Sequence, residues 1–388
     1  MKCKKGIFNL SHVSAGFTAV LVGYTSSVVI IIQAATAAGA TSSQIESWLL
    51  ALGLAMGITS IIFSWYFKKP VLTAWSTPGA AMLVAAVGQY DMSVVLGAFV
   101  ISGLLIVLTG LISPLSKALA NIPPQLATAM LGAILLSFCV KTFSPVMTDP
   151  IIFFCMFAAF MAGKRFVPQY TMAILLVVGI VYSVISGAFD NQSIDLTFAK
   201  PEWITPSFSI AAMINLSFPL YIITMLSQNL PGIAMMRSHA YEVPVKPLLL
   251  GSGIANILFA PFGGFSVNLA AISAAICMNK DVDEDPAQRY RAVIWAGIFY
   301  VIAGIWATTV VATFLALPKE VTQILAGLAL LGTLLMCFQT AFKDENIRES
   351  ALYTFLITMS GVTFLGIGSV VWGLVVGLLH LHFIAPKA

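Results

Sequence analysis

The sequence has few charged residues, and this scarcity sets the class of protein. Of its 388 residues only 9% are Asp, Glu, Lys or Arg, whereas 59% are hydrophobic. A water-soluble domain carries roughly 25% charged residues, because its surface must be hydrated. A chain with so little charge must face lipid. The composition therefore excludes a soluble globular protein and predicts a polytopic membrane protein.

Signals of several other functions are also missing. The five cysteines lie mostly within apolar runs and show neither disulfide nor metal-ligand spacing. The four histidines lie near the ends of apolar runs. The acidic run at 281–285 contains magnesium-type ligands, but it is a single cluster with basic neighbours, which is typical of a hydrated loop. We therefore expect no metal, no cofactor and no enzymatic activity.

Apolar runs of membrane-spanning length recur along the chain. A spanning helix needs roughly 20 residues, and twelve runs meet or nearly meet that length. They lie at about 12–33, 47–67, 92–113, 123–140, 149–163, 170–188, 208–229, 246–259, 290–315, 319–340, 350–365 and 367–384. The first is too long for a cleavable signal peptide. Two further runs, about 72–88 and 262–278, are interrupted by Ser, Pro, Gly or Asn, and they raise the predicted number of segments to fourteen.

The distribution of Lys and Arg supports fourteen crossings, because cytoplasmic loops collect basic residues. With the N-terminus inside, fourteen crossings place every basic residue on the inner side except Lys141, Lys200 and Lys319. Leaving out either interrupted run inverts all later loops and destroys this bias. We therefore expect both interrupted runs to cross the membrane and both termini to be cytoplasmic. The net charge of +4 then reflects membrane orientation and does not indicate nucleic acid binding.

A polar stretch at about 189–207 divides the chain into two halves of seven segments, 10–188 and 208–384. Because seven is odd, related halves must have opposite orientations in the membrane. A shift of 190 residues aligns "WSTPGAAMLVA" (75–85) with "FSVNLAAISAA" (265–275), and a shift of 195 aligns a second pair of segments. These nearly equal offsets predict an inverted repeat.

The first interrupted run carries a helix-start signal in the middle of the membrane. Ser76 or Thr77 can cap free backbone N–H groups, and Pro78 fits the first helical turn without losing a hydrogen bond. A packing kink is the alternative interpretation. Two such interruptions at equivalent places favour a polar site, because irregular backbone at membrane depth must be surrounded by protein or water.

The second interrupted run, "APFGGFSVN", has a similar signal. Pro261, Gly263 and Gly264 suit an extended approach, and Ser266 or Asn268 can cap the helix that follows. Each helix N-terminus presents roughly half a positive charge. Two of them suit a single carboxylate or another monovalent anion, since no Lys or Arg lies well inside a predicted span. The sequence therefore predicts a monovalent anion site between two half-helices.

Aromatic residues adjoin both predicted helix starts. Trp75 and Phe265 each precede a cap and can hold an apolar or aromatic body beside the anion. Helix packing is the alternative role for both side chains. Tyr24 is a weaker candidate of the same kind.

A third polar interruption, "TMLSQNLPG", ends the predicted eighth crossing with Ser227, Gln228 and Asn229. Uncharged side chains there can hydrogen-bond a substrate without a buried charge, although capping of the helix end is the alternative. No Asp or Glu lies well inside a predicted span, so a proton relay of carboxylates is not expected. A coupled proton would then travel with the substrate itself, and the alternative carriers are a terminal histidine such as His12 or His239, or a water held among the polar groups of the site.

The motifs "STPGAA" (76–81), "SQNLPG" (227–232) and "APFGGFSVNLAAISAA" (260–275) resemble the bacterial benzoate:proton symporter family, and the resemblance covers essentially the whole chain. This family is similar to uracil:proton symporters, to xanthine and uric-acid permeases and to sulfate/bicarbonate transporters. The resemblance implies fourteen segments in a seven-plus-seven inverted repeat, in which segments three and ten each contain a short strand and a half-helix. It also implies a core domain that holds the substrate and a gate domain that is often the surface of a homodimer.

The resemblance also implies a set of substrate contacts. They are the backbone after Trp75 and Ser76, the side chains of Phe265, Ser266 and Asn268, and the stretch from Ser227 to Asn229. Nucleobase:proton symporters carry glutamates roughly where this chain has Ser227 and Val267, which argues against a nucleobase substrate.

The function implied is import of an aromatic carboxylate such as benzoate, with a proton, across the bacterial inner membrane. A passive anion channel, or a transporter of nucleobases or inorganic anions on the same fold, is the alternative.

Overall fold

The computed structural model describes residues 9–112, 122–189 and 197–384, and most of them are helical. The longer helices are α1 (Leu10–Ala37), α2 (Ser42–Phe67), α3 (Thr77–Ala86), α4 (Met92–Leu111), α6 (Pro124–Lys141), α7 (Pro150–Phe166), α8 (Thr171–Ile185), α11 (Leu230–Ser238), α12 (Val245–Phe259), α14 (Tyr290–Ile305), α15 (Ala307–Leu315), α16 (Lys319–Ala341), α17 (Arg348–Ser360) and α18 (Ser369–Phe383). Shorter elements are α9 (Ile210–Ala212), α10 (Phe218–Thr224), α13 (Ile272–Met278), β1 (Thr73–Ala74) and β2 (Asn268–Leu269).

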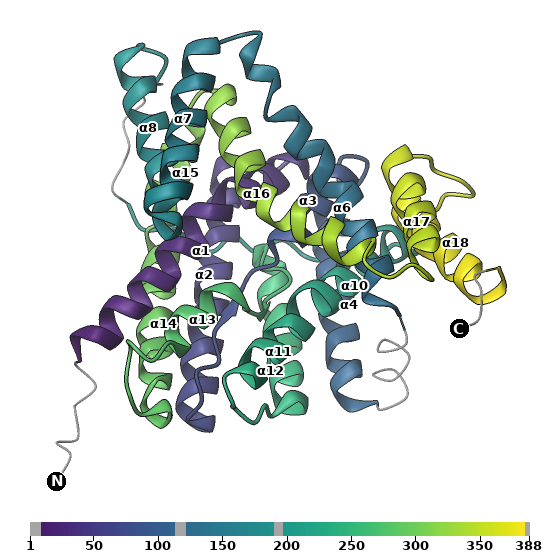
Figure 1. Ribbon diagram of the computed structural model, residues 1–388, viewed down its shortest axis with the longest axis horizontal. Coiled ribbons are helices and arrows are strands. Elements are labelled where there is room, and N and C mark those ends of the chain that lie inside the picture. The colour runs from purple at the N-terminus through teal and green to yellow at the C-terminus, as the bar shows by residue number, and fades with distance from the viewer. Residues whose placement is uncertain (1–8, 113–121, 190–196, 385–388) are drawn as a thin grey trace.

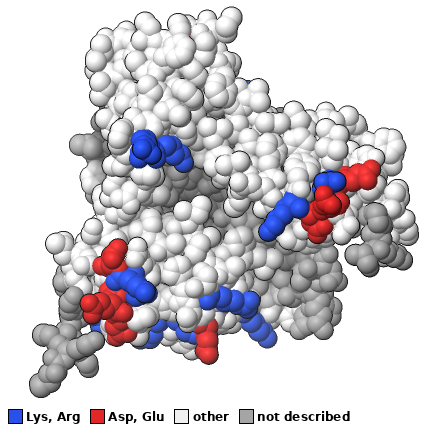
Figure 2. Space-filling model, in the orientation of Figure 1, with Lys and Arg blue, Asp and Glu red and all other residues white. Residues whose placement is uncertain are grey.

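The helices form one bundle. Figure 1 shows α7 and α8 on one side and α17 and α18 on another, with α16 and α6 running between them. Eight helical stretches of the described residues are long and apolar enough to cross a membrane, and α14 with α15 adds a ninth that is bent by 62°. Charged side chains form a few separate clusters on the face in Figure 2, and the other described residues of that face are not Lys, Arg, Asp or Glu.

These observations confirm a mostly helical, polytopic membrane protein. The count of fourteen segments and the inverted repeat remain predictions. Part of the argument for orientation rests on Lys2, Lys4, Lys5, Lys117 and Lys387, which lie outside the described residues.

Each interrupted run contains a short strand and a short helix. β1 leads into α3, and β2 leads into α13. The two strands pair antiparallel, with Thr73 opposite Leu269 and Ala74 opposite Asn268. This two-stranded ribbon brings the two interrupted runs together, although their passage through the membrane remains a prediction.

The second interrupted run differs from the prediction in two details. Pro261 lies in a 3-10 turn, η5 (Ala260–Phe262), and not in an extended approach. α13 begins at Ile272, and its N-cap, Ala271, makes no side-chain capping bond. The prediction that Ser266 or Asn268 caps this helix is therefore wrong.

The physical reason is that both predicted caps have other partners. Ser266 has a left-handed backbone with a φ of 46°, and its Oγ accepts a hydrogen bond from Thr224 Oγ1 at 3.1 Å. Asn268 belongs to β2, and its Nδ2 donates to the Ser266 carbonyl at 2.7 Å. Both side chains are thus engaged in the turn that precedes β2 and are not available to the start of α13.

Buried polar side chains hold the ribbon in place. Thr73 Oγ1 lies 2.6 Å from Thr59 Oγ1 and 2.8 Å from Ser60 Oγ, both on α2. On the other side, Asn256 of α12 accepts from the Val267 N–H at 2.6 Å and donates to the Val267 carbonyl at 3.1 Å. Since buried backbone groups must be hydrogen-bonded, these side chains allow irregular backbone inside an apolar bundle.

Candidate functional site

The first half of the candidate site is the start of α3. Ser76 Oγ accepts the Gly79 N–H at 3.0 Å, so the prediction of Ser76 as a helix cap is confirmed. Pro78 lies in the first turn and has no N–H. Thr77 is partly exposed, and neither its N–H nor its hydroxyl has a partner among the described residues. Thr77 therefore has two donors available at the positive end of a helix.

Two aromatic rings lie beside this helix start. The Trp75 and Tyr24 ring centroids are 4.9 Å apart, and Trp75 Nε1 donates to Ser27 Oγ at 2.7 Å. The Tyr24 hydroxyl is buried and lacks a partner within the described part of the chain. A buried hydroxyl without a partner is unfavourable, so it is a candidate to bind a polar ligand.

The second half of the candidate site lies on the helical stretch Ile210–Ser238. This stretch contains two π-helical turns, η3 (Met213–Ser217) and η4 (Met225–Asn229). The predicted crossing ended near residue 229, but the helix continues to Ser238, so this prediction was wrong in its boundary. π-helical turns widen a helix locally and are frequent at functional sites.

The three polar residues of η4 differ in what they contact. Asn229 is fully buried, and its Oδ1 accepts the Leu269 N–H of β2 at 2.9 Å. Ser227 Oγ is buried, and Gln228 is partly buried, and neither side chain has a partner in the described ranges. Asn229 therefore fixes the ribbon, whereas Ser227 and Gln228 have polar groups that can meet a ligand.

The predicted contacts of the second interrupted run are mostly structural. Phe265 is fully buried, and its ring centroid lies 5.8 Å from that of Trp48 and 5.1 Å from that of Phe99. This arrangement favours the packing role that the sequence left open. Ser266 is bonded to Thr224, and Asn268 keeps one buried atom, Oδ1, without a partner among the described residues.

Positive charge at the candidate site comes from the helix dipole of α3 and not from charged side chains in the part of the chain that the structure describes. Among the described residues, Arg289 is the only buried Lys, Arg, Asp or Glu, and it lies in the loop beyond α13. An anion at the start of α3 would therefore be stabilised by the helix N-terminus and by neutral donors. No group of three His, Cys, Asp or Glu residues that could hold a metal occurs in the described ranges.

Comparisons with known proteins agree with this architecture. A family model described as benzoate membrane transport protein matches residues 6–383. The "Benzoate membrane transport protein" of Acinetobacter baylyi (strain ATCC 33305 / BD413 / ADP1) is 36% identical over 389 residues, which cover 100% of this chain and 99% of that protein. The "Inner membrane protein YdcO" of Escherichia coli (strain K12) is 42% identical over 365 residues, or 94% and 93% of the two chains.

Two solved structures share the fold at low sequence identity. The transmembrane domain of the cyanobacterium bicarbonate transporter BicA superposes with a TM-score of 0.61 at 13% identity, covering 96% of this chain and 97% of that chain. The murine anion transporter Slc26a9 in the inward-facing state gives 0.59 at 14% identity, covering 98% and 68%. The family match over nearly the whole chain and the full-length relative establish that this membrane transport protein belongs to the benzoate membrane transport protein family.

Proposed function

We propose that the protein is a secondary active transporter that imports an aromatic carboxylate such as benzoate, together with a proton, across the bacterial inner membrane. One observation carries the proposal: the paired rings of Trp75 and Tyr24 adjoin the start of α3, where Thr77 has donors available. Rings and donors at one place match the two parts of an aromatic carboxylate. The family match and the name of the Acinetobacter relative support the same substrate class.

The proposed pose places the carboxylate between α3 and the turn that precedes α13. Thr77 donates to the carboxylate, and the N-terminus of α3 supplies roughly half a positive charge. The aromatic ring of the substrate lies against Trp75 and Tyr24. Ser227 and Gln228 of η4 complete the hydrogen bonds, because their side chains lack partners among the described residues.

For the fold, we infer fourteen segments in two inverted halves, 10–188 and 208–384. Close helix pairs support this inference. A Cβ at Gly53 of α2 would lie 2.6 Å from Gly304 of α14, and one at Gly103 of α4 would lie 3.1 Å from the Gly253 carbonyl of α12. Counted in the predicted order, α2 and α14 are segments two and eleven, and α12 and α4 are segments nine and four. Adding seven to each segment number, and counting on from fourteen to one, therefore converts the pair of segments two and eleven into the pair nine and four.

The inferred domains are interleaved across the two halves. The core domain contains α1, α3, α10 and α13 around the ribbon, and the gate domain contains α6 to α8 and α16 to α18. Movement of the core against the gate would expose the site to either side in turn. The gate is also the surface that we assign to a homodimer.

Proton coupling is assigned to the substrate itself. Buried Asp and Glu are absent from the described residues. Among the histidines, His12 is fully buried at the start of α1, where its Nε2 lies 3.0 Å from Asp283 Oδ2. The proton is then bound to the carboxylate of the substrate, which crosses as the neutral acid, so that no protonatable side chain at the site is required as the proton carrier.

The substrate class can be tested by a melting screen of the purified protein. Benzoate and ring-substituted benzoates should raise the melting temperature by several degrees, because ligand at a hundred times its Kd stabilises the folded state by about 2.7 kcal/mol. Uracil, xanthine, sulfate and bicarbonate should leave it unchanged. A larger shift with a nucleobase or an inorganic anion than with any benzoate would contradict the proposed substrate.

A further inference from the structure

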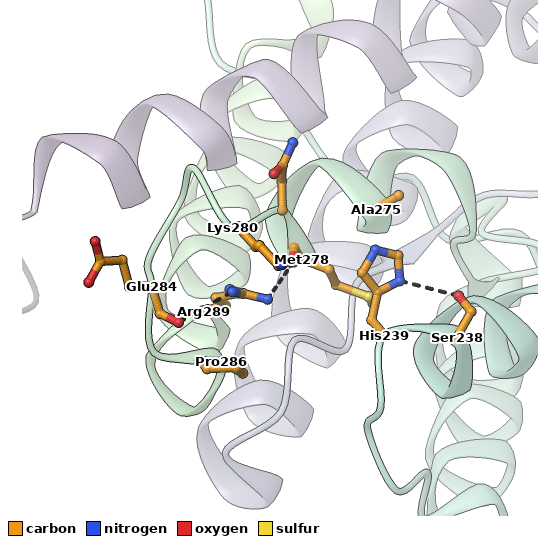
Figure 3. A pocket seen from close by; sticks show the side chains of 9 residues that line it. Ser238, His239, Ala275, Met278, Lys280, Glu284, Pro286 and Arg289 are labelled. Atoms are coloured by element: carbon orange, nitrogen blue, oxygen red, sulfur yellow. Dashed lines mark hydrogen bonds between the residues drawn. The ribbon is translucent and has the colours of Figure 1, made fainter.

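A pocket of about 930 Å³ opens at the end of the helical stretch that carries η4. Ser238 and His239 line it from the end of α11, Met278 lines it from the end of α13, and Lys280, Glu284 and Arg289 line it from the loop that leads to α14. Figure 3 shows these side chains around one opening. The pocket thus lies where both α11 and α13 leave the region of the ribbon.

Arg289 forms a buried positive wall of this pocket. Its side chain is only 5% exposed, and its Nε and Nη1 donate to the carbonyls of Asp283 and Met278, each at 2.8 Å. Its Nη2 lies 3.5 Å from the Glu284 carbonyl. All these acceptors are neutral, and no carboxylate in the described ranges forms an ion pair with Arg289. A buried charge that is not neutralised favours a counter-ion of opposite sign.

The acidic residues of the same loop are directed elsewhere. The Asp283 carboxylate lies 3.0 Å from His12 Nε2 on α1. The Asp285 carboxylate accepts the Ala287 N–H at 2.9 Å. Figure 3 shows the Glu284 carboxylate pointing away from the Arg289 guanidinium. The loop therefore presents the positive charges of Arg289 and Lys280 to the pocket.

We propose that this pocket is a second, weaker binding site for an aromatic monocarboxylate, at the inner end of the transport path. Arg289 and Lys280 hold the carboxylate, and the His239 ring and the Met278 side chain, which are adjacent in Figure 3, contact the aromatic ring. The identity of the ligand rests on the proposed function. The pocket is assigned to the end of the transport path because Ser238, which lines it, ends the helical stretch that also carries Ser227 and Gln228.

The charge preference of the pocket can be measured with a cysteine at Ser238, in a background without the native cysteines. Ser238 is exposed, lines the pocket, and is close in size to cysteine. A negatively charged thiosulfonate reagent should modify S238C about tenfold faster than a positively charged one, because local potential concentrates ions of opposite sign. Lys280→Gln should lower that ratio, and Lys246→Gln, an exposed lysine that does not line the pocket, should leave it unchanged.

Protection by benzoate tests binding in the pocket directly. In S238C that also carries Gln228→Leu, which weakens the central site, benzoate should still slow modification, and adding Lys280→Gln should remove this protection. Equal reactivity with both reagents, or no protection by benzoate, would overturn the second site. Protection in this variant together with no benzoate transport by the wild-type protein would contradict the proposed function alone, whereas benzoate transport by the wild type without protection in the variant would contradict the pocket alone.

Discussion

Replacing Gln228 with leucine should raise the KM of benzoate uptake about tenfold to a hundredfold and leave the protein folded. The Gln228 side chain is partly buried in η4, and it bonds to no other described residue, so its removal breaks no internal hydrogen bond. A hydrogen bond to a charged group contributes roughly 1.5–3 kcal/mol, which corresponds to a loss of affinity of about tenfold to a hundredfold. Initial uptake rates in proteoliposomes, measured together with the melting temperature, would separate a binding defect from a folding defect.

Two control variants test whether the effect on uptake is specific to Gln228. Gln169→Leu makes the same chemical change at an exposed position beyond α7 and should not alter uptake. Asn229→Leu should instead lower the melting temperature, because it leaves the buried Leu269 N–H without its acceptor. Wild-type affinity and rate in Gln228→Leu would assign that residue to the scaffold and remove it from the site.

Replacing Gly263 with alanine should sharply reduce the amount of folded protein in the membrane. Gly263 has a φ of 91°, a conformation that disfavours residues with a Cβ, and it ends the η5 turn just before the ribbon. An added Cβ would also overlap the indole of Trp48, which packs against Phe265. Strained backbone and a steric clash together should cost several kcal/mol, roughly the size of the largest single-site effects.

Gly332→Ala is the matched control, because a Cβ at that helical position would meet no atom within 4 Å. Detergent-solubilised yield and melting temperature would be compared for the two variants. We expect Gly332→Ala to resemble the wild type. If Gly263→Ala melts at the wild-type temperature, the backbone described for this turn is wrong.

Local signals in the sequence predicted the first half of the site well. A hydroxyl followed by Pro78 encodes a helix start within a few residues, and Ser76 does cap α3. The same reasoning failed for Ser266, because its hydroxyl is hydrogen-bonded in a tertiary contact. The partner is the Thr224 hydroxyl, 42 residues away in the sequence. Phe265 likewise has its ring surrounded by Trp48 and Phe99, which no nearby sequence pattern reveals.

The sequence pattern did not predict the π-helical turn η4, for a related reason. A polar trio followed by Pro231 is a reasonable signal for a helix end, yet the helix continues through this residue to Ser238. Proline lacks the N–H that an α-helical turn requires, and a wider turn before it accommodates that loss. The contact between His12 and Asp283 was also missed, because 271 residues separate its partners. Local pattern therefore located the polar residues, and tertiary packing decided which of them retain free polar groups.

Counterflow of labelled benzoate distinguishes a benzoate carrier from a channel, because only a carrier with a benzoate site can produce it. Proteoliposomes that contain unlabelled benzoate would be diluted into labelled benzoate at about pH 8, where roughly one carboxylic acid molecule in ten thousand is neutral and leak through the lipid is small. We predict a transient accumulation of label above its final level with the wild-type protein and a much smaller one with Gln228→Leu at the same benzoate concentration. Equilibration of the label without that overshoot in the wild type would indicate a channel or a different substrate, and would contradict transport of benzoate by a carrier.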